Sequence, residues 1–98
     1  MSEPEVGHKD VLGKPRWSLF PWDAAEEVVR VLMFGAGKYA PDNWRKVENG
    51  KELYFEAMIR HAVRHRQGEV YDAESGLRHT AHLACDALFV LAFELAGK

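Results

Sequence analysis

The sequence lacks the features that mark secreted, disulfide-linked or membrane proteins. Its single cysteine, Cys85, excludes an internal disulfide, and its place in an apolar segment favours a small core residue. The longest apolar run spans residues 87–93, far short of the roughly 20 residues that a membrane helix needs. No apolar stretch of the secretory type stands near the N-terminus. We therefore expect a soluble protein with a cytoplasmic location and no membrane partner.

An excess of charge of one sign is also missing. The formal net charge is -2 at pH 7, so no binding surface for a nucleic-acid polymer is predicted. Hydrophobic residues make up 47% and charged residues 29% of the chain, which is typical of a globular protein rather than a disordered tail. A chain of 98 residues fits one domain, and we predict that residues 1–98 form a single domain.

The period-two pattern typical of β-strands is not found, whereas apolar residues recur at helical spacing in three segments. These segments run from Asp23 to Tyr39, from Lys51 to Gln67 and from Ser75 to Leu95. Residues 1–20, broken by proline and glycine, are predicted to form an extended arm, and turn residues mark 40–50 as a connector. The sequence thus predicts an all-α fold, a small three-helix-core bundle with an extended N-terminal arm. Its apolar surface exceeds what one small bundle buries, which predicts assembly into a helical homo-oligomer.

Three polar residues interrupt the apolar third segment. His79, His82 and Asp86 stand three and four residues apart, so a helix places them on one side. Ionisable groups that are buried there need partners. One interpretation is an internal network, in which Asp86 accepts a hydrogen bond from His82 and His79 caps the helix. The other is a ligand cleft, in which Asp86 holds a divalent cation and the histidines meet a phosphate or a metal.

The second segment adds two histidines, His61 and His65, four residues apart at its apolar arc. With His79 and His82 they have the spacing of metal ligands, but the chain offers no thiolate pair and no His-Glu-x-x-His order for zinc. Arg60, at the edge of the arc, suits a phosphate because its planar group donates two hydrogen bonds at once. We predict that Arg60 and His61 contact phosphate.

Carboxylates for a Mg²⁺ or Mn²⁺ ion are spread over the three segments. Glu27 lies near the apolar boundary of the first segment and is a better inward ligand than Glu26, which we expect in solvent. Magnesium sites commonly combine a few carboxylates with substrate phosphates. The predicted metal ligands are Glu27, Glu56 and Asp86. For Glu56, a solvated ladder of ion pairs on the outer helix face is the alternative.

The arm and the connector carry cations and aromatic side chains. Lys14 and Arg16 flank a proline, and Lys38 stands beside glycines, a combination that suits a phosphate although no complete phosphate-loop motif occurs. Aromatic rings in these segments offer a stacking surface for a base, or alternatively plug the ends of the core. The predicted base contacts are Trp17, Tyr39, Asn43 and Trp44.

Three ordered strings of the sequence resemble one family. They are KPRWSLFPWDAAEEVVRVLMFGAGKYAPDNW, IRHAVRHRQGE and DAESGLRHTAHLACDALFVLAFE, and together they extend from Lys14 to Glu94. This pattern is similar to that of the N-terminal domain family of dATP/dGTP diphosphohydrolases, which is mostly phage-encoded. The resemblance implies an all-α relative of the MazG-like nucleotide pyrophosphohydrolases. Those enzymes form dimers or tetramers and use Mg²⁺ or Mn²⁺ to cleave a nucleoside triphosphate between its α and β phosphates.

The resemblance leaves the catalytic acids open. The broader superfamily holds its metals with Glu-x-x-Glu and Glu-x-x-Asp strings on neighbouring helices, and the predicted helices here carry neither. A rival hypothesis is therefore a phage protein that binds a nucleotide without cleaving it. Such a sponge would sequester an immune signal, for example a cyclic nucleotide or an ADP-ribose derivative. A third hypothesis is a structural or partner-binding helical module.

The sequence taken as a whole favours the hydrolase. We predict a pocket between the second and third helical segments, closed by residues 14–17 of the arm, that binds a purine deoxynucleoside triphosphate such as dATP or dGTP. Cleavage would release the nucleoside monophosphate and pyrophosphate. In this hypothesis His79 and His82 are the catalytic residues and orient a phosphate or a metal-bound water. For a phage-encoded chain, the expected location is the host cytoplasm.

Overall fold

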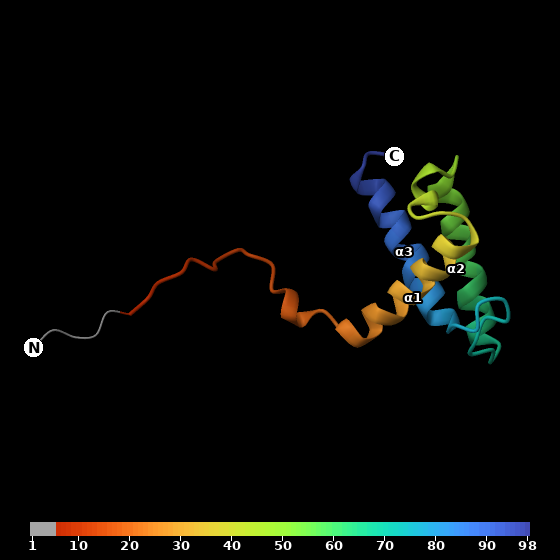
Figure 1. Ribbon diagram of the computed structural model, residues 1–98, viewed down its shortest axis with the longest axis horizontal. Coiled ribbons are helices and arrows are strands. Elements are labelled where there is room, and N and C mark those ends of the chain that lie inside the picture. Colours follow the sequence, from red (N-terminus) through yellow and green to blue (C-terminus); the bar gives the residue numbers. More distant parts are fainter. Residues whose placement is uncertain (1–5) are drawn as a thin grey trace, which may run out of the picture.

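Three α-helices carry the fold in residues 6–98, the part of the chain that the computed structural model describes (Figure 1). The helices are α1 (Trp22–Lys38), α2 (Gly50–Arg66) and α3 (His79–Leu95). Two short 3-10 turns, η1 (Trp17–Leu19) and η2 (Asn43–Lys46), precede α1 and α2. No strand occurs within residues 6–98, so the prediction of a small all-α domain is confirmed.

The helix boundaries follow local signals. Pro21 stands at the N-cap of α1, where a missing backbone N–H costs nothing, and Asp23 lies in the first turn near the positive end of the helix dipole. Helix α3 begins at His79, four residues later than predicted. The reason is that the Asp72 side chain accepts the backbone N–H of Ser75, and Gly76 has a left-handed φ of 72°. These residues form a turn and cannot be part of the helix.

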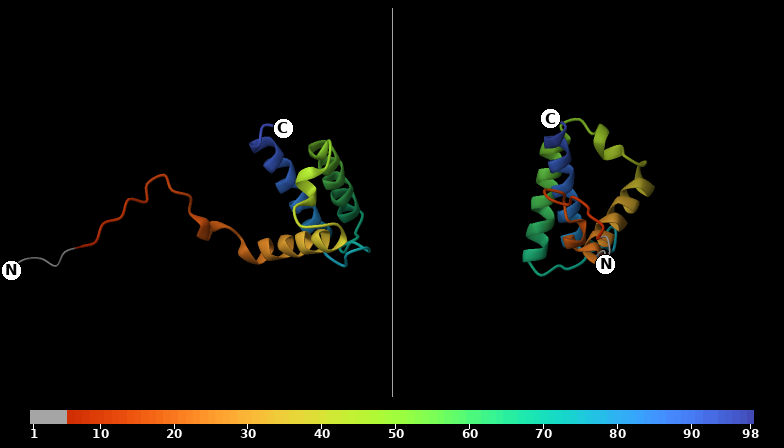
Figure 2. Two further views of the ribbon diagram at one scale, coloured as in Figure 1. Left: turned by 45° about the horizontal axis from the view of Figure 1, so that its top comes forward. Right: turned by 90° about the vertical axis from the view of Figure 1, so that its left-hand side faces the viewer.

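Helices α2 and α3 lie side by side and run antiparallel (Figure 2). The start of α2 meets the end of α3, since a Cβ built on Gly50 would lie only 2.7 Å from the Phe93 ring. One turn further, the Tyr54 and Phe89 rings are 4.8 Å apart in an edge-to-face arrangement. Glycine at position 50 therefore allows the backbone of α2 to approach the aromatic end of α3.

Replacing Gly50 with alanine should destabilise the fold. The added methyl group overlaps the buried Phe93 ring, and overpacking of this kind costs about 1–3 kcal/mol. Gly37→Ala in α1 is the matched control, because a methyl group added there would meet no atom of the described residues within 4 Å and alanine favours a helix by up to about 1 kcal/mol. Urea unfolding would measure both. An unchanged midpoint for Gly50→Ala would contradict the close approach.

Helix α1 crosses the α2–α3 pair and closes the small core (Figure 1). Val31 of α1 packs with Ala81 and Cys85 of α3, and Cys85 is only 2% exposed. Burial raises the pKa of the Cys85 thiol to about 12. The thiol is therefore an inert core group, as the sequence indicated.

The segment before α1 lies away from the helices. Figure 1 draws residues 6–16 as an irregular path that leads to η1, and all residues from 6 to 21 are exposed. Residues 1–5 of the predicted arm lie outside the described residues. Large apolar side chains are also exposed on the helices, including Met33, Leu53, Phe55 and Leu91. Among the described residues, no helix is long and apolar enough to cross a membrane.

Candidate functional site

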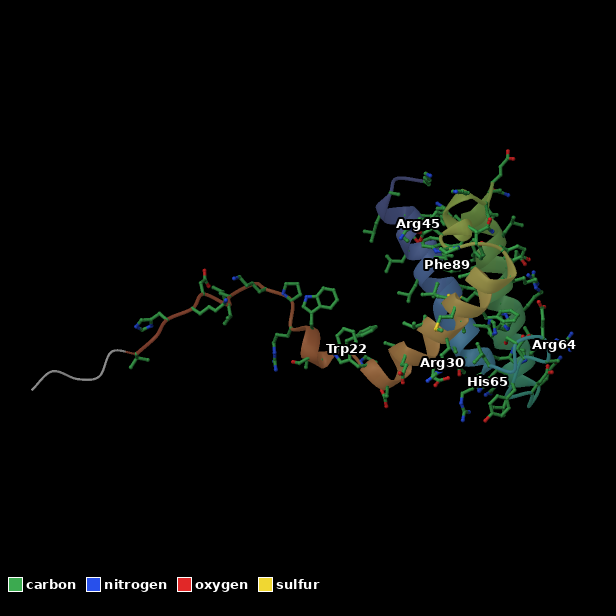
Figure 3. The ribbon with its side chains drawn as sticks, viewed as in Figure 1. Trp22, Arg30, Arg45, Arg64, His65 and Phe89 are labelled. Atoms are coloured by element: carbon green, nitrogen blue, oxygen red, sulfur yellow. The ribbon has the colours of Figure 1, made fainter. Side chains whose placement is uncertain are left out.

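A cleft of about 710 Å³ lies between α1, the connector and the inner faces of α2 and α3. The cleft has two ends that differ in character. Tyr54 lies at one end and His61 at the other, seven residues apart on α2, or roughly 10 Å along the helix axis. The end near the connector is aromatic, where Trp44 and Phe89 stack with ring centroids 4.2 Å apart. Figure 3 shows Arg45 and Phe89 near each other at this end, whereas His65 lies toward the far end of α2 and outside the cleft lining. The ionisable residues that line the other, polar end include His61, Asp72, His82 and Asp86, together with the paired Lys38 and Glu74.

Three imidazole rings meet at the polar end. Nδ1 of His61 lies 2.8 Å from Nδ1 of His79, and the His61 and His82 rings stack with centroids 4.6 Å apart. Burial lowers the pKa of His61 to about 4, and the nearby His82 and His79 add to this effect. Burial is also the main reason that the pKa of His82 is lowered, against the opposing influence of Asp72. At neutral pH, His61 and His82 are therefore uncharged.

Asp72 connects this cluster to the loop between α2 and α3. Its Oδ2 accepts hydrogen bonds from the backbone N–H and the hydroxyl of Ser75, both at 2.9 Å. Because the single hydroxyl proton of Ser75 points to Asp72, Ser75 Oγ accepts from Nε2 of His82 at 2.7 Å. Burial alone would raise the pKa of Asp72, but the Ser75 hydrogen bonds and His82 outweigh it and lower the pKa. Asp72 is thus an ionised carboxylate that orients His82 through Ser75.

His79 is the most enclosed member of the cluster, with 4% of its side chain exposed. Its Nε2 lies 3.3 Å from Oε2 of Glu69, but without the alignment of a hydrogen bond, and it has no other partner among residues 6–98. One ligand atom each of His61, Asp72 and His79 lie within 4.8 Å of one another. These three side chains have the donor types and the proximity of a metal site.

Asp86 faces the cleft as a buried and incompletely paired carboxyl group. It is 8% exposed, and its Oδ2 has no hydrogen-bond partner in the described part of the chain. Burial raises the pKa of Asp86 to about 7, and the Arg60 guanidinium works against this rise. His82 bonds to Ser75 instead of Asp86, so the His82–Asp86 hydrogen bond of the internal-network interpretation is not observed among these residues.

The sequence matches, over residues 4–98, the family described as dATP/dGTP diphosphohydrolase, N-terminal. The chain belongs to this family. It is similar to a protein of Salmonella phage PMBT28 named dATP/dGTP diphosphohydrolase, with 36% identity over 85 residues that cover 87% of the chain. The chain spans only 29% of the length of that relative. No solved structure matches the chain. The family that the sequence resembled is thereby confirmed.

In this member of the diphosphohydrolase N-terminal family, several predicted ligand contacts do line the cleft. Tyr39, Asn43 and Trp44 lie at its aromatic end, where Trp44 already stacks on Phe89 and carries the Arg45 guanidinium 4.3 Å from its ring centroid. Tyr39 is 64% exposed and therefore more open to a base. Lys38 also lines the cleft, where its Nζ donates a hydrogen bond to Glu74 of the loop.

Other predicted residues lie elsewhere in this family member. Glu27 contacts Arg30 on α1 at 3.7 Å and does not line the cleft, and Glu56 is exposed on α2. Of the three carboxylates predicted to bind a metal, only Asp86 lines the cleft. Exposed residues outside the cleft lining are Lys14, Arg16 and Trp17 of the arm and Arg60 and His65 of α2.

Asp72 is the site residue that the sequence interpretation missed. Two signals pointed to it. Asp72 stands three residues before Ser75, a spacing that is typical of a side chain capping a turn. Glu69 and Asp72 also form a Glu-x-x-Asp string, but this string lies in the loop after α2 rather than on a helix. A metal-binding string that is expected on a helix therefore does not predict Asp72.

Acidification should weaken the fold through His61. Because its folded pKa, about 4, is below the ordinary value of 6.5, the stability it contributes is lost as the pH falls from about 6.5 to about 4. Between these pH values we expect the free energy of unfolding of His61→Gln to fall by about 1–2 kcal/mol less than that of the wild type. This value allows for the partial exposure of the His61 ring. Urea unfolding in metal-free buffer measures the difference, and Asp86 titrates in both proteins. The exposed His65→Gln variant should follow the wild type; if His61→Gln does so too, the prediction is wrong.

Proposed function

We propose that this domain binds a purine deoxynucleoside triphosphate in the cleft and, with Mg²⁺ or Mn²⁺, hydrolyses it to the deoxynucleoside monophosphate and pyrophosphate. The observation that carries the proposal is the cleft itself, which joins an aromatic end to a polar end. There a buried carboxylate oxygen has no hydrogen-bond partner among residues 6–98. A volume of about 710 Å³ is in the range of small-molecule sites. The name of the phage relative supports a dATP or dGTP substrate.

The two ends suggest how the nucleotide lies. Aromatic faces stack well on a purine, so we place the base on the exposed ring of Tyr39, near Trp44, which already stacks on Phe89. Asn43 lies beside them to hydrogen-bond the edge of the base. The phosphates then extend toward His61, His82 and Lys38. Neutral His61 can donate from Nε2 to a phosphate oxygen when its Nδ1 accepts from His79. The single N–H of neutral His82 already donates to Ser75, so Nδ1 of His82 is an acceptor and suits the attacking water.

The charges at the cleft favour dependence on a divalent cation. More acidic than basic residues line it, so a triphosphate on its own would be repelled. Mg²⁺ is usually held by one or two carboxylates together with substrate phosphates. Oδ2 of Asp86, which has no hydrogen-bond partner in the described part of the chain, fits that donor set. The acidic lining residues are Asp42, Asp72, Glu74 and Asp86, against Lys38 and Arg45.

In the proposed reaction, residues of the cleft would position the attacking water and hold the triphosphate from which pyrophosphate leaves. A bound cation supplies neutralisation of phosphate charge and a more acidic water. Asp86 would hold the cation, and Asp72 would fix the orientation of His82 through Ser75. His79, which lies behind His61, would position that ring rather than touch the substrate. The aliphatic side chains of α1 that line the cleft would limit the access of other water molecules to the phosphates.

Self-association would complete the site. The exposed apolar side chains of a single chain are more numerous than an isolated domain of this size usually leaves in water, which supports a homo-oligomer, a dimer or a tetramer. Lys14, Arg16 and Trp17 would reach a nucleotide only if the arm folds onto a cleft, either its own or that of a second copy.

We place the activity in the host cytoplasm, where nucleoside triphosphates are available.

The test is incubation of the protein with dATP or dGTP and Mg²⁺ or Mn²⁺, followed by chromatographic separation of the products. Equal amounts of monophosphate and pyrophosphate are expected, with no product in EDTA. Release of orthophosphate or of free triphosphate would show that the protein cleaves a bond other than the one between the α and β phosphates. Absence of any product from common nucleotides would overturn the proposal.

A second candidate is binding without hydrolysis, favoured by the positions of Glu27 and Glu56 away from the cleft. The chain would then be a sponge for a nucleotide immune signal, such as a cyclic nucleotide or an ADP-ribose derivative. Heating the purified protein and identifying the released small molecule separates the two candidates. An unchanged nucleotide, recovered from a protein that turns over none, would support the sponge.

A further inference from the structure

We propose that His61, Asp72 and His79 form a binding site for a divalent transition metal of the Zn²⁺ type, distinct in donor chemistry from the cation proposed at Asp86. The three residues come from α2, from the loop before α3 and from the first residue of α3. One ligand atom of each lies within 4.8 Å of the other two. Ligands of one ion must converge in this way. The packing of α2 on α3 brings together the two histidines, which are 18 residues apart in the sequence.

The donor set decides which ions fit. Two imidazole nitrogens and one carboxylate oxygen suit Zn²⁺, Co²⁺ or Ni²⁺, whereas Mg²⁺ prefers oxygen ligands alone. Three protein ligands also leave a fourth position of a tetrahedral ion open, as in catalytic zinc sites. His61 and Asp72 line the cleft, so the open position would face it.

The surrounding contacts match those that support metal ligands. The Ser75 hydrogen bonds hold Asp72 in place, and Glu69 lies 3.3 Å from Nε2 of His79. If Nδ1 of His79 binds the ion, its Nε2 carries the proton and lies beside this carboxylate, although the pair lacks the alignment of a hydrogen bond in this structure. A carboxylate next to the outer nitrogen is the usual support for a ligating histidine.

A hydrogen-bond network without metal explains the cluster less completely. In the 2.8 Å contact between the two Nδ1 atoms, one nitrogen donates and the other accepts, and an ion would replace that proton. The network still leaves Nε2 of the buried His79 without a hydrogen-bond partner among residues 6–98. Such orphaned buried nitrogens are uncommon, and an ion on Nδ1 would fix a proton on this nitrogen, which faces the Glu69 carboxylate 3.3 Å away.

Metal binding at this site does not depend on the proposed function. Only one consequence rests on that function, namely that the open position would accept a nucleotide phosphate oxygen or the attacking water. The experiment is therefore done without nucleotide, and nucleotide turnover with Mg²⁺ is measured separately. Failure of metal binding would leave the turnover result intact, and the reverse also holds.

The full chain, freed of metal with a chelator, is titrated with Co²⁺ and followed by visible absorption, and with Zn²⁺ by calorimetry in excess Mg²⁺. We expect one tightly bound ion per chain and the intense absorption of a four-coordinate Co²⁺. Asp72→Asn and His61→Gln should weaken binding at least about 10- to 100-fold, the effect of losing even a supporting group. His65→Gln, which removes an exposed histidine of the same helix, should bind as the wild type does. No binding by the wild type, or equal binding by Asp72→Asn, would overturn the proposal.

X-ray absorption of the Zn²⁺-loaded wild type covers the case in which both variants fail to fold. Two imidazole ligands are expected in the first coordination sphere. Fewer than two, or a sphere made of oxygen alone, would show that the ion lies elsewhere and would also overturn the proposal.

Discussion

An Asp86→Asn variant is expected to be more stable than the wild type above about pH 7 and to lose cation-dependent hydrolysis of dATP or dGTP. The two effects share one cause, which is the burial of a carboxylate that has an oxygen without a hydrogen-bond partner in the described structure. A charge in this environment destabilises the fold, and its position at the cleft is consistent with a role in binding a cation.

The direction of the stability change follows from the pKa of Asp86. Burial raises it from the ordinary value of 3.8 to about 7, so the folded state binds a proton more tightly than the unfolded state does. The stability gained from that proton is complete below about pH 4 and is lost as the pH rises to about 7. Each pKa unit corresponds to about 1.4 kcal/mol, so the advantage of Asp86→Asn near pH 8 is at most on the order of 4 kcal/mol. The two proteins should be equally stable near pH 3.

Urea unfolding at several pH values and the nucleotide assay together check this prediction. Glu94→Gln is the matched control, because it also neutralises a carboxylate on α3 but at an exposed position. We expect it to change neither the pH profile nor the turnover. An Asp86→Asn protein with wild-type turnover would remove Asp86 from cation binding, and an unchanged pH profile would show that its burial is not costly.

A Phe93→Ala variant is expected to lose about 3–5 kcal/mol of stability, the usual cost of deleting a buried phenylalanine ring. Phe93 is 6% exposed, and its ring meets Trp44 edge-on at 5.7 Å and covers Gly50. In a domain with so few fully buried side chains, this is a large share of the total stability. Leu95→Ala, two residues later and 80% exposed, is the control and should change little.

A double-mutant cycle tests the contact that underlies this prediction. Gly50→Ala is destabilising because its methyl group meets the Phe93 ring. In the Phe93→Ala background that ring is gone, so adding Gly50→Ala should be neutral or stabilising. Strictly additive effects, measured by urea unfolding of all four proteins, would mean that the two residues are not in contact.

Comparison with the sequence prediction shows where local information sufficed. The predicted first and second helical segments agree with α1 and α2 to within one residue at each end. Their apolar spacing and the proline and glycine at their boundaries are local signals, and a helix depends mainly on local hydrogen bonds. The third segment was predicted to start at Ser75, because its apolar pattern could not reveal that Asp72 holds Ser75 in a turn.

The amino-acid sequence by itself thus determined the all-α class, the family, and the placement of His79, His82 and Asp86 on one side of a helix. Only the tertiary structure decided which partners these residues meet. The antiparallel packing of α2 on α3 brings His61 to His79 and leaves His65 exposed, although both histidines have similar positions in the helical pattern. The loop adds Asp72 to the cluster, and α1 with the connector encloses the cleft that Asp86 faces. Such contacts join residues distant in sequence, and their geometry depends on how helices cross and where loops turn, which periodicity does not encode.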